Sequence, residues 1–138
     1  MNGKEAFQSS DREQNTTEFF HADLRSLDRR KLEGLRYEAE RRIKDIEQQF
    51  KERYGADWDP VKIGDILLQP DFYKGRIEGY PVTLLEEFTD YAAVQMRRWE
   101  IEDVYVEGGY ASNRDKQFKW SQYQEAANKE LNRRAKTQ

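Results

Sequence analysis

A long helix rich in charged residues is the feature that most constrains the fold of this chain. From about Ser26 to Tyr54, apolar residues recur at steps of three and four, which places them along one face of an α-helix. The other positions are mostly polar or charged. At 1.5 Å per residue this helix is roughly 43 Å long. The apolar stripe consists of Leu32, Leu35, Ala39, Ile43, Ile46, Phe50 and Tyr54.

Little aliphatic material is left to cover this stripe. Leu, Ile, Val and Phe together make up 27 of 138 residues, near the range in which chains become disordered. The net charge is only −3, however, and eighteen aromatic residues can each bury a large area. We therefore expect a folded chain with a thin core, in which part of the stripe meets another chain.

The pattern as a whole predicts a mainly α protein, a small helical bundle with one long N-terminal helix. Residues 1–16 are polar and predict a flexible or partner-ordered arm, and residues 17–135 form a single helical domain. A short helix is expected from Thr17, and Ser26 or Asp28 caps the long helix. Gly34 suggests close approach of another backbone, and Gly55 ends the helix.

Shorter elements are expected between the long helices. Asp59 is a suitable N-cap for a short helix that starts at Pro60, reaches about Gln69 and is ended by Pro70. Residues 71–80 contain two glycines and predict a loop or a short extended piece.

Two further long helices are expected in the second half of the chain. Residues 83–86 have the sequence of a capping box and precede a helix to about Asp103. Residues 104–111 either extend that helix or form a loop or β-hairpin around a Gly-Gly turn, and we favour the second. Asn113 then caps a C-terminal helix, whose apolar face is Trp120, Tyr123, Ala127, Leu131 and Ala135.

No stretch of the sequence has the length and apolarity of a membrane span, and the N-terminus has no signal-peptide pattern. The absence of cysteine excludes disulfides and thiolate metal sites and is compatible with a reducing compartment. We expect a cytoplasmic location, or the host cytoplasm and the virion if the protein is viral.

The chemically active residue types are not arranged as in known catalytic or metal sites. His21 is the only histidine and has no nucleophile motif beside it. Asp57, Asp59 and Asp65 lack the spacing of a calcium loop and are explained by capping and turn formation. The carboxylates of residues 86–90 and 100–103 are typical of a solvated helix face. We expect no enzymatic activity, metal or cofactor.

Charge is distributed unevenly along the chain. Residues 55–110 carry five basic and twelve acidic side chains, whereas residues 111–138 carry seven basic and three acidic ones. This acidic middle and basic end can pair within one molecule or between copies in a ring. Nucleic acid is a possible partner only for the basic C-terminal helix, and the isoelectric point near 5.4 argues against it.

This arrangement resembles the small head-completion adaptors of tailed bacteriophages, which form rings between portal and tail. The resemblance covers about the last 60 residues: the helix over 83–103, the element Tyr105-Val106-Glu107-Gly108-Gly109-Tyr110 and the helix from Asn113. It implies a few-helix subunit with a projecting loop or hairpin and with terminal arms that order on assembly.

We therefore expect a non-enzymatic assembly subunit that acts through protein–protein contacts as a homo-oligomer or within a larger assembly, with a phage head-tail connector as its narrower form. The alternative is an inhibitor or regulator that binds a host enzyme through its acidic middle segment. The candidate interaction residues are Leu32, Leu35, Ile43, Ile46, Phe50, Tyr105, Tyr110, Trp120, Arg133 and Arg134.

Overall fold

The computed structural model describes residues 18–55, 58–106 and 111–137, and within these ranges it is helical, with no β-strand. This confirms the prediction of a mainly α helical bundle. Residues 18–21 form a helical turn. The remaining elements are the 3-10 turn η1 (Leu24–Ser26) and the helices α2 (Arg29–Tyr54), α3 (Pro60–Leu67), α4 (Lys74–Glu78), α5 (Val82–Tyr105) and α6 (Ala111–Thr137).

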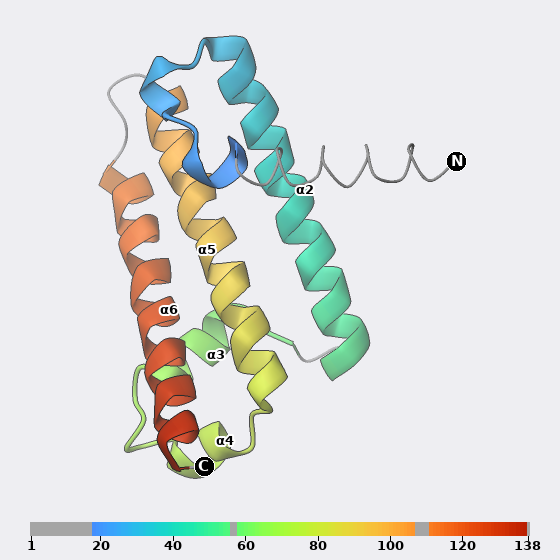
Figure 1. Cartoon of the computed structure of the whole chain (residues 1–138), viewed down its shortest axis with the longest axis vertical. Coiled ribbons are helices and arrows are strands. Elements are labelled where there is room, and N and C mark those ends of the chain that lie inside the picture. Colours follow the sequence, from blue (N-terminus) through green and yellow to red (C-terminus); the bar gives the residue numbers. More distant parts are fainter. Residues whose placement is uncertain (1–17, 56–57, 107–110, 138) are drawn as a thin grey trace.

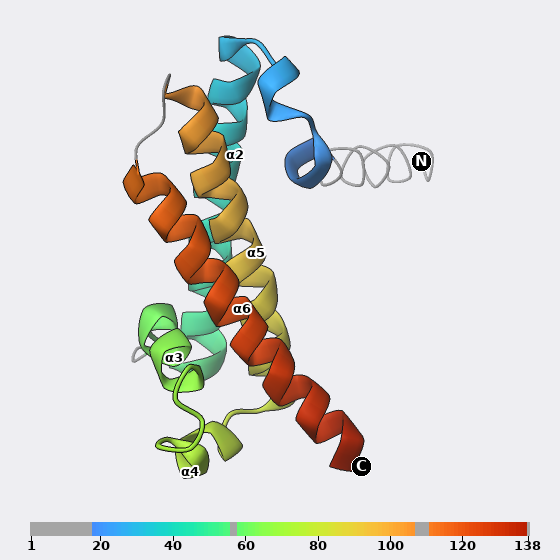
Figure 2. The ribbon, with the colours of Figure 1, turned by 90° about the vertical axis from the view of Figure 1, so that its left-hand side faces the viewer.

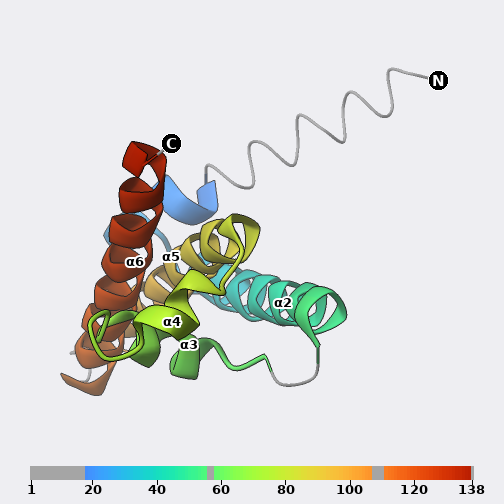
Figure 3. The same cartoon turned by 90° about the horizontal axis from the view of Figure 1, so that it is seen from below.

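Three long helices lie side by side, with α5 between α2 and α6 and antiparallel to both of them (Figure 1). Turned by 90°, the molecule shows α6 inclined across α5, with α3 and α4 beside its C-terminal half (Figure 2). Seen from below, α2 and α6 lie on opposite sides of α5, and α3 lies against α6 (Figure 3). The lower end of the bundle is therefore built from α3, α4 and the ends of the long helices.

Helix α2 starts and ends at residues with identifiable capping chemistry. The Asp28 side chain accepts a hydrogen bond from the backbone N–H of Lys31 at 2.8 Å, which satisfies one of the free donors of the first turn. Gly55 ends the helix with a φ of 96°, a conformation that favours glycine. Of the two predicted N-caps, Asp28 is therefore confirmed, and Ser26 belongs instead to the separate 3-10 turn Leu24–Ser26, which Asp23 caps.

The apolar stripe of α2 is covered within this chain. Leu32, Ile43 and Phe50 are buried, and Leu35 and Ile46 are partly buried against the same core. The prediction that part of the stripe meets another chain is therefore wrong for the buried Leu32, Ile43 and Phe50, because they are already covered within this chain. Among the described residues, no atom beyond its own stretch of helix lies within 4 Å of a Cβ built at Gly34, so no other described segment makes the expected close backbone approach.

Helix α3 was predicted from the sequence, whereas helix α4 was not. Asp59 caps α3 by accepting from the backbone N–H of Lys62, and Pro60 occupies the first turn. Residues 71–80, predicted as loop or extended, contain the single-turn helix α4 instead. Its Ile77 is buried, so packing on the core rather than local propensity fixes this turn.

Helix α5 also differs at both ends from the prediction. It begins after Pro81 with no side-chain cap, so the capping box over residues 83–86 is not used. It continues through Val104 and Tyr105, which removes the first strand of the expected hairpin. Arg29 and Arg36 lie over the Tyr105 ring at 4.2 and 4.1 Å from its centre, which holds this last turn against α2. Residues 107–110, the expected turn, lie outside the described residues.

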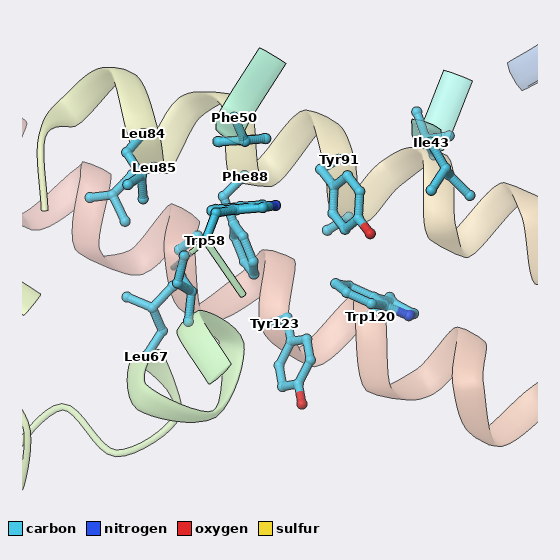
Figure 4. Close-up of a cluster of buried hydrophobic side chains, with 14 of the residues drawn as sticks. Ile43, Phe50, Trp58, Leu67, Leu84, Leu85, Phe88, Tyr91, Trp120 and Tyr123 are labelled. Carbon is cyan, nitrogen blue, oxygen red and sulfur yellow. The ribbon is translucent and has the colours of Figure 1, made fainter. Parts of the chain in front are cut away.

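Aromatic side chains form the centre of the core (Figure 4). Phe50 of α2 and Trp58 stack with ring centres 3.7 Å apart, and Tyr91 of α5 meets both rings edge-on. Two residues of α6 continue the cluster: the Trp120 ring centre lies 5.4 Å from that of Tyr91 and 5.2 Å from that of Tyr123. Such pairs add about 0.5–1.5 kcal/mol each beyond area burial, so a few large rings compensate for the scarcity of aliphatic residues.

Helix α3 lies very close to α6 because Gly64 faces the ring of Tyr123. A Cβ built at Gly64 lies 2.5–2.6 Å from three ring carbons. The Tyr123 hydroxyl donates to the Asp65 carboxylate at 2.5 Å, and burial raises the pKa of this hydroxyl, so it stays protonated as a donor. Glycine at position 64 is thus a requirement of the α3–α6 contact.

We expect Gly64→Ala to destabilise the fold by about 1–3 kcal/mol, because the new methyl group overpacks the contact with Tyr123. Gly34→Ala is the matched control, since it adds the same methyl group to an open helix position and should stabilise by up to about 1 kcal/mol. Urea unfolding followed by circular dichroism measures both. Equal free energies of unfolding for the two variants would show that the α3–α6 contact is not tight in solution.

Candidate functional site

A groove of about 420 Å³ separates the C-terminal half of α6 from the segment that joins α3 to α4. One wall is formed by Leu67, Leu68, Pro70 and Ile77, and the other by one side of α6. Its apolar floor and charged rim are typical of a surface that binds a polypeptide. The α6 residues along the groove are Gln122, Glu125, Ala126, Lys129, Glu130 and Arg133.

The wall opposite α6 is shaped by local sequence signals. Helix α3 ends at Leu67, since Pro70 cannot continue it. Ile77 of α4 is buried and anchors the return of the chain toward the core. Residues 68–72 are left as a projecting loop between the two helices, and this loop borders the groove.

Arg134 fixes the width of the groove at its lower end. Its guanidinium donates to the backbone carbonyls of Ile77 and Tyr80 at 2.7 and 2.6 Å, and to the Glu130 carboxylate at 2.7 Å. The carbonyls at the end of a helix carry partial negative charge, which an arginine side chain complements. Arg134 therefore connects α4 to α6 by charge-assisted hydrogen bonds rather than by apolar packing.

Glu130 is held by two arginines of the following turn. Arg133 donates to it at 2.6 Å and Arg134 at 2.7 Å. The hydrogen bond from Arg133 is the main cause of a lowered pKa of this carboxyl, and it outweighs the opposing effect of partial burial. Glu130 thus stays ionised beside the groove at neutral pH.

Exposed apolar side chains gather at this end of the molecule. Among the described residues, six large apolar side chains are exposed, and four of them belong to residues 61–82. Phe72 is 78% exposed and Leu68 is 43% exposed, and both lie in the loop beside the groove. Single exposed apolar residues are common, but several beside one groove mark an interaction surface.

The predicted interaction residues are not brought together in one place. Trp120 is buried in the core, so it is not available for stacking on bases. Tyr105 is partly buried near the top of α5, under two arginines, and Tyr110 lies outside the described residues. Only Arg133 and Arg134 lie at the groove, where Arg134 is engaged with α4.

The predicted acidic middle and basic end pair only slightly within the chain. In the described part of the sequence, one ion pair joins them, between Arg114 and Asp103 at 3.9 Å. The carboxylates of α5 are not gathered into a catalytic pair. Burial and the nearby Glu86 carboxylate raise the pKa of Asp90, and both residues remain on the exposed face.

A second hollow of about 410 Å³ lies at the opposite end, between residues 22–25 and the ends of α5 and α6. Its buried arginine makes hydrogen bonds within the fold. Arg97, which is buried, donates to the backbone carbonyls of Phe19 and Ala22 and to the Glu100 carboxylate. These bonds hold the N-terminal turns against α5 and explain why an arginine is buried there.

Leu68 and Ile77, which line the groove, and Phe72, which lies in the loop beside it, were not identified from the sequence. The signal available was an apolar pair, Leu67-Leu68, directly before Pro70, followed by an aromatic residue in a loop. The sequence of such a pair does not determine whether both leucines or only one of them is buried. Only the position of α6 determines that Leu67 is buried and Leu68 borders the groove.

Comparisons with known proteins find no matching family model, no similar curated protein and no similar solved structure. None of the described helices is long and apolar enough to cross a membrane. Within the described ranges, no group of three or more His, Asp or Glu side chains is placed to hold a metal ion.

We expect Arg134→Ala to destabilise the fold by about 1–3 kcal/mol, because it leaves the carbonyls of Ile77 and Tyr80 without their charged donor. Arg133→Ala removes the same kind of side chain from the exposed neighbouring position and should change stability much less. Thermal unfolding checks the difference, and hydrogen exchange should be faster over residues 74–80 in the Arg134 variant alone.

The lowered pKa of Glu130 predicts a defined pH dependence. Its ionised form is favoured in the folded state, so its contribution to stability is present above the ordinary glutamate pKa and is lost as the pH falls through the folded value. Glu130→Gln should therefore be less stable than the unaltered protein at pH 7, and this difference should shrink toward pH 3.

Denaturant titrations at pH 7, 5, 4 and 3 measure this trend. Glu125→Gln is the control, because the exposed Glu125 carboxylate has only a 3.9 Å contact with Lys129. A stability difference for Glu130→Gln that is independent of pH would contradict the assignment.

Proposed function

We propose that this protein is a non-enzymatic assembly subunit that binds another polypeptide in the groove between α6 and residues 67–77. The observation that carries the proposal is the placement of exposed Phe72 and Leu68 beside a groove with an apolar floor. An apolar centre surrounded by charged residues matches the usual anatomy of protein interfaces.

The energetics of the surface support a macromolecular partner. A chain with so few apolar residues leaves a large aromatic ring almost fully in water, although burying such a ring is worth about 1.5–3 kcal/mol. Aromatic anchors of this kind are frequent among the residues that dominate binding energy. The surrounding charges of α6 then set the orientation of the partner.

The resemblance to head-completion adaptors gives the narrower form of this proposal, in which the partner is another protein of a phage particle. The resemblance is supported by the two antiparallel helices α5 and α6. One feature argues against the resemblance: α5 continues through Tyr105, where the expected hairpin would start.

A photocrosslinking amino acid placed at position 72 in the source organism should capture the partner, which can then be purified. Phe72→Ser should weaken binding to that partner about 10- to 100-fold, because it removes an aromatic anchor. Phe118→Ser is the matched control, since Phe118 is 65% exposed on α6 and lies outside both the groove lining and the loop beside it.

Isothermal titration calorimetry measures the dissociation constants, and circular dichroism verifies that both variants stay folded. Equal binding by the two variants would contradict the proposed site. Binding that depends instead on Glu86→Gln and Asp90→Asn substitutions would favour the alternative, an inhibitor that uses the acidic middle segment.

A further inference from the structure

The charged residues of α6 along the groove have a self-complementary order. Glu125, Lys129 and Arg133 follow one another at steps of four residues, so they lie in one line on the helix surface. This line begins with an acidic residue and ends with a basic one. A second copy of the same helix, turned end over end, presents the opposite order.

We propose that the groove binds a second copy of this chain, with α6 of each copy lying in the groove of the other. This inference rests on the proposed function and names the partner of that site. The two copies are related by a twofold axis beside Lys129, so that the helices pair antiparallel. Contacts of this type are isologous, and each one occurs twice.

The twofold axis determines which charges meet. A residue a given number of positions before Lys129 faces the residue the same number of positions after it in the partner copy. Glu125 of each copy therefore faces Arg133 of the other. The two Lys129 side chains meet near the axis, where each also approaches its own Glu125 at 3.9 Å. The charge pattern thus favours this arrangement over a parallel one, in which like charges face each other.

The apolar parts of the surface fit the same arrangement. Ala126 is small and only partly buried, so it permits close approach of a second helix. The aliphatic stems of Lys129 and Arg133 can cover the apolar floor of the groove while their charged ends stay in water. Leu68 and Phe72 of the loop then flank the incoming helix and lose their exposure.

Sedimentation velocity of the full chain over a range of concentrations tests the proposal. Glu125→Arg and Arg133→Glu should each raise the dimer dissociation constant at least about tenfold, because each places two like-charge pairs across the axis. The double variant, with both substitutions, restores opposite charges and should return the constant to within about threefold of the original value. Lys119→Glu is the control, since it reverses a charge on α6 away from the groove.

A dimer whose dissociation constant responds to the single variants and is restored in the double variant supports the proposal. A chain that stays monomeric at all concentrations overturns it, as does a dimer that the double variant does not restore. If the chain is monomeric and position 72 still crosslinks to a different protein, this inference fails and the proposed function stands. Circular dichroism confirms that each variant remains helical.

Discussion

The stack of Phe50 on Trp58 is the contact on which the lower half of the molecule depends. It joins the last turns of α2 to the residue that precedes α3, with the two rings parallel to within 3° and 3.7 Å apart. Trp58 Nε1 is buried without a hydrogen-bond partner among the described residues, which costs about 1–3 kcal/mol. Burial of the two rings and the edge contacts with Tyr91 must exceed that cost. The stack holds the start of α3 near the end of α2, and α3 in turn packs on α6, where Gly64 and Tyr123 complete the contact.

Large aromatic rings let a highly charged chain form a core of its own. The sequence correctly indicated few aliphatic residues, and from this we inferred that neighbouring chains must cover the stripe of α2. That inference underestimated how much area a cluster of rings can bury. Each of the three long helices contributes a ring that is at most 2% exposed. These rings, Phe50 of α2, Tyr91 of α5 and Tyr123 of α6, are buried in one core. Among the described residues, six large apolar side chains remain exposed, and two of them, Leu68 and Phe72, lie in the loop between α3 and α4.

The helices that follow strong local signals could be predicted from the sequence, and the parts governed by tertiary packing could not. Local capping chemistry determines the roles of Asp28, Asp59 and Gly55. The ends of α2 and the start of α3 could therefore be predicted from the sequence. Helix α4 has no side-chain cap and forms because Ile77 is buried. Similarly, α5 passes its predicted end because Arg29 and Arg36 of α2 hold Tyr105, a contact between residues about 70 positions apart. The groove could not be predicted from the sequence for the same reason, since it exists only between segments distant in sequence.

The groove stays open because its lower end is held by hydrogen bonds instead of side-chain packing. Arg134 holds the carbonyls of α4 at a fixed distance from α6, and its planar guanidinium can reach two carbonyls and Glu130 at once. A lysine at this position would present a single ammonium group and would fix the spacing less strictly. If an apolar residue replaced Arg134, α4 would be free to close onto Ala126 and cover the groove floor. An arginine that keeps two helices apart, beside a loop that leaves Phe72 in water, preserves an apolar surface that this chain does not cover by itself.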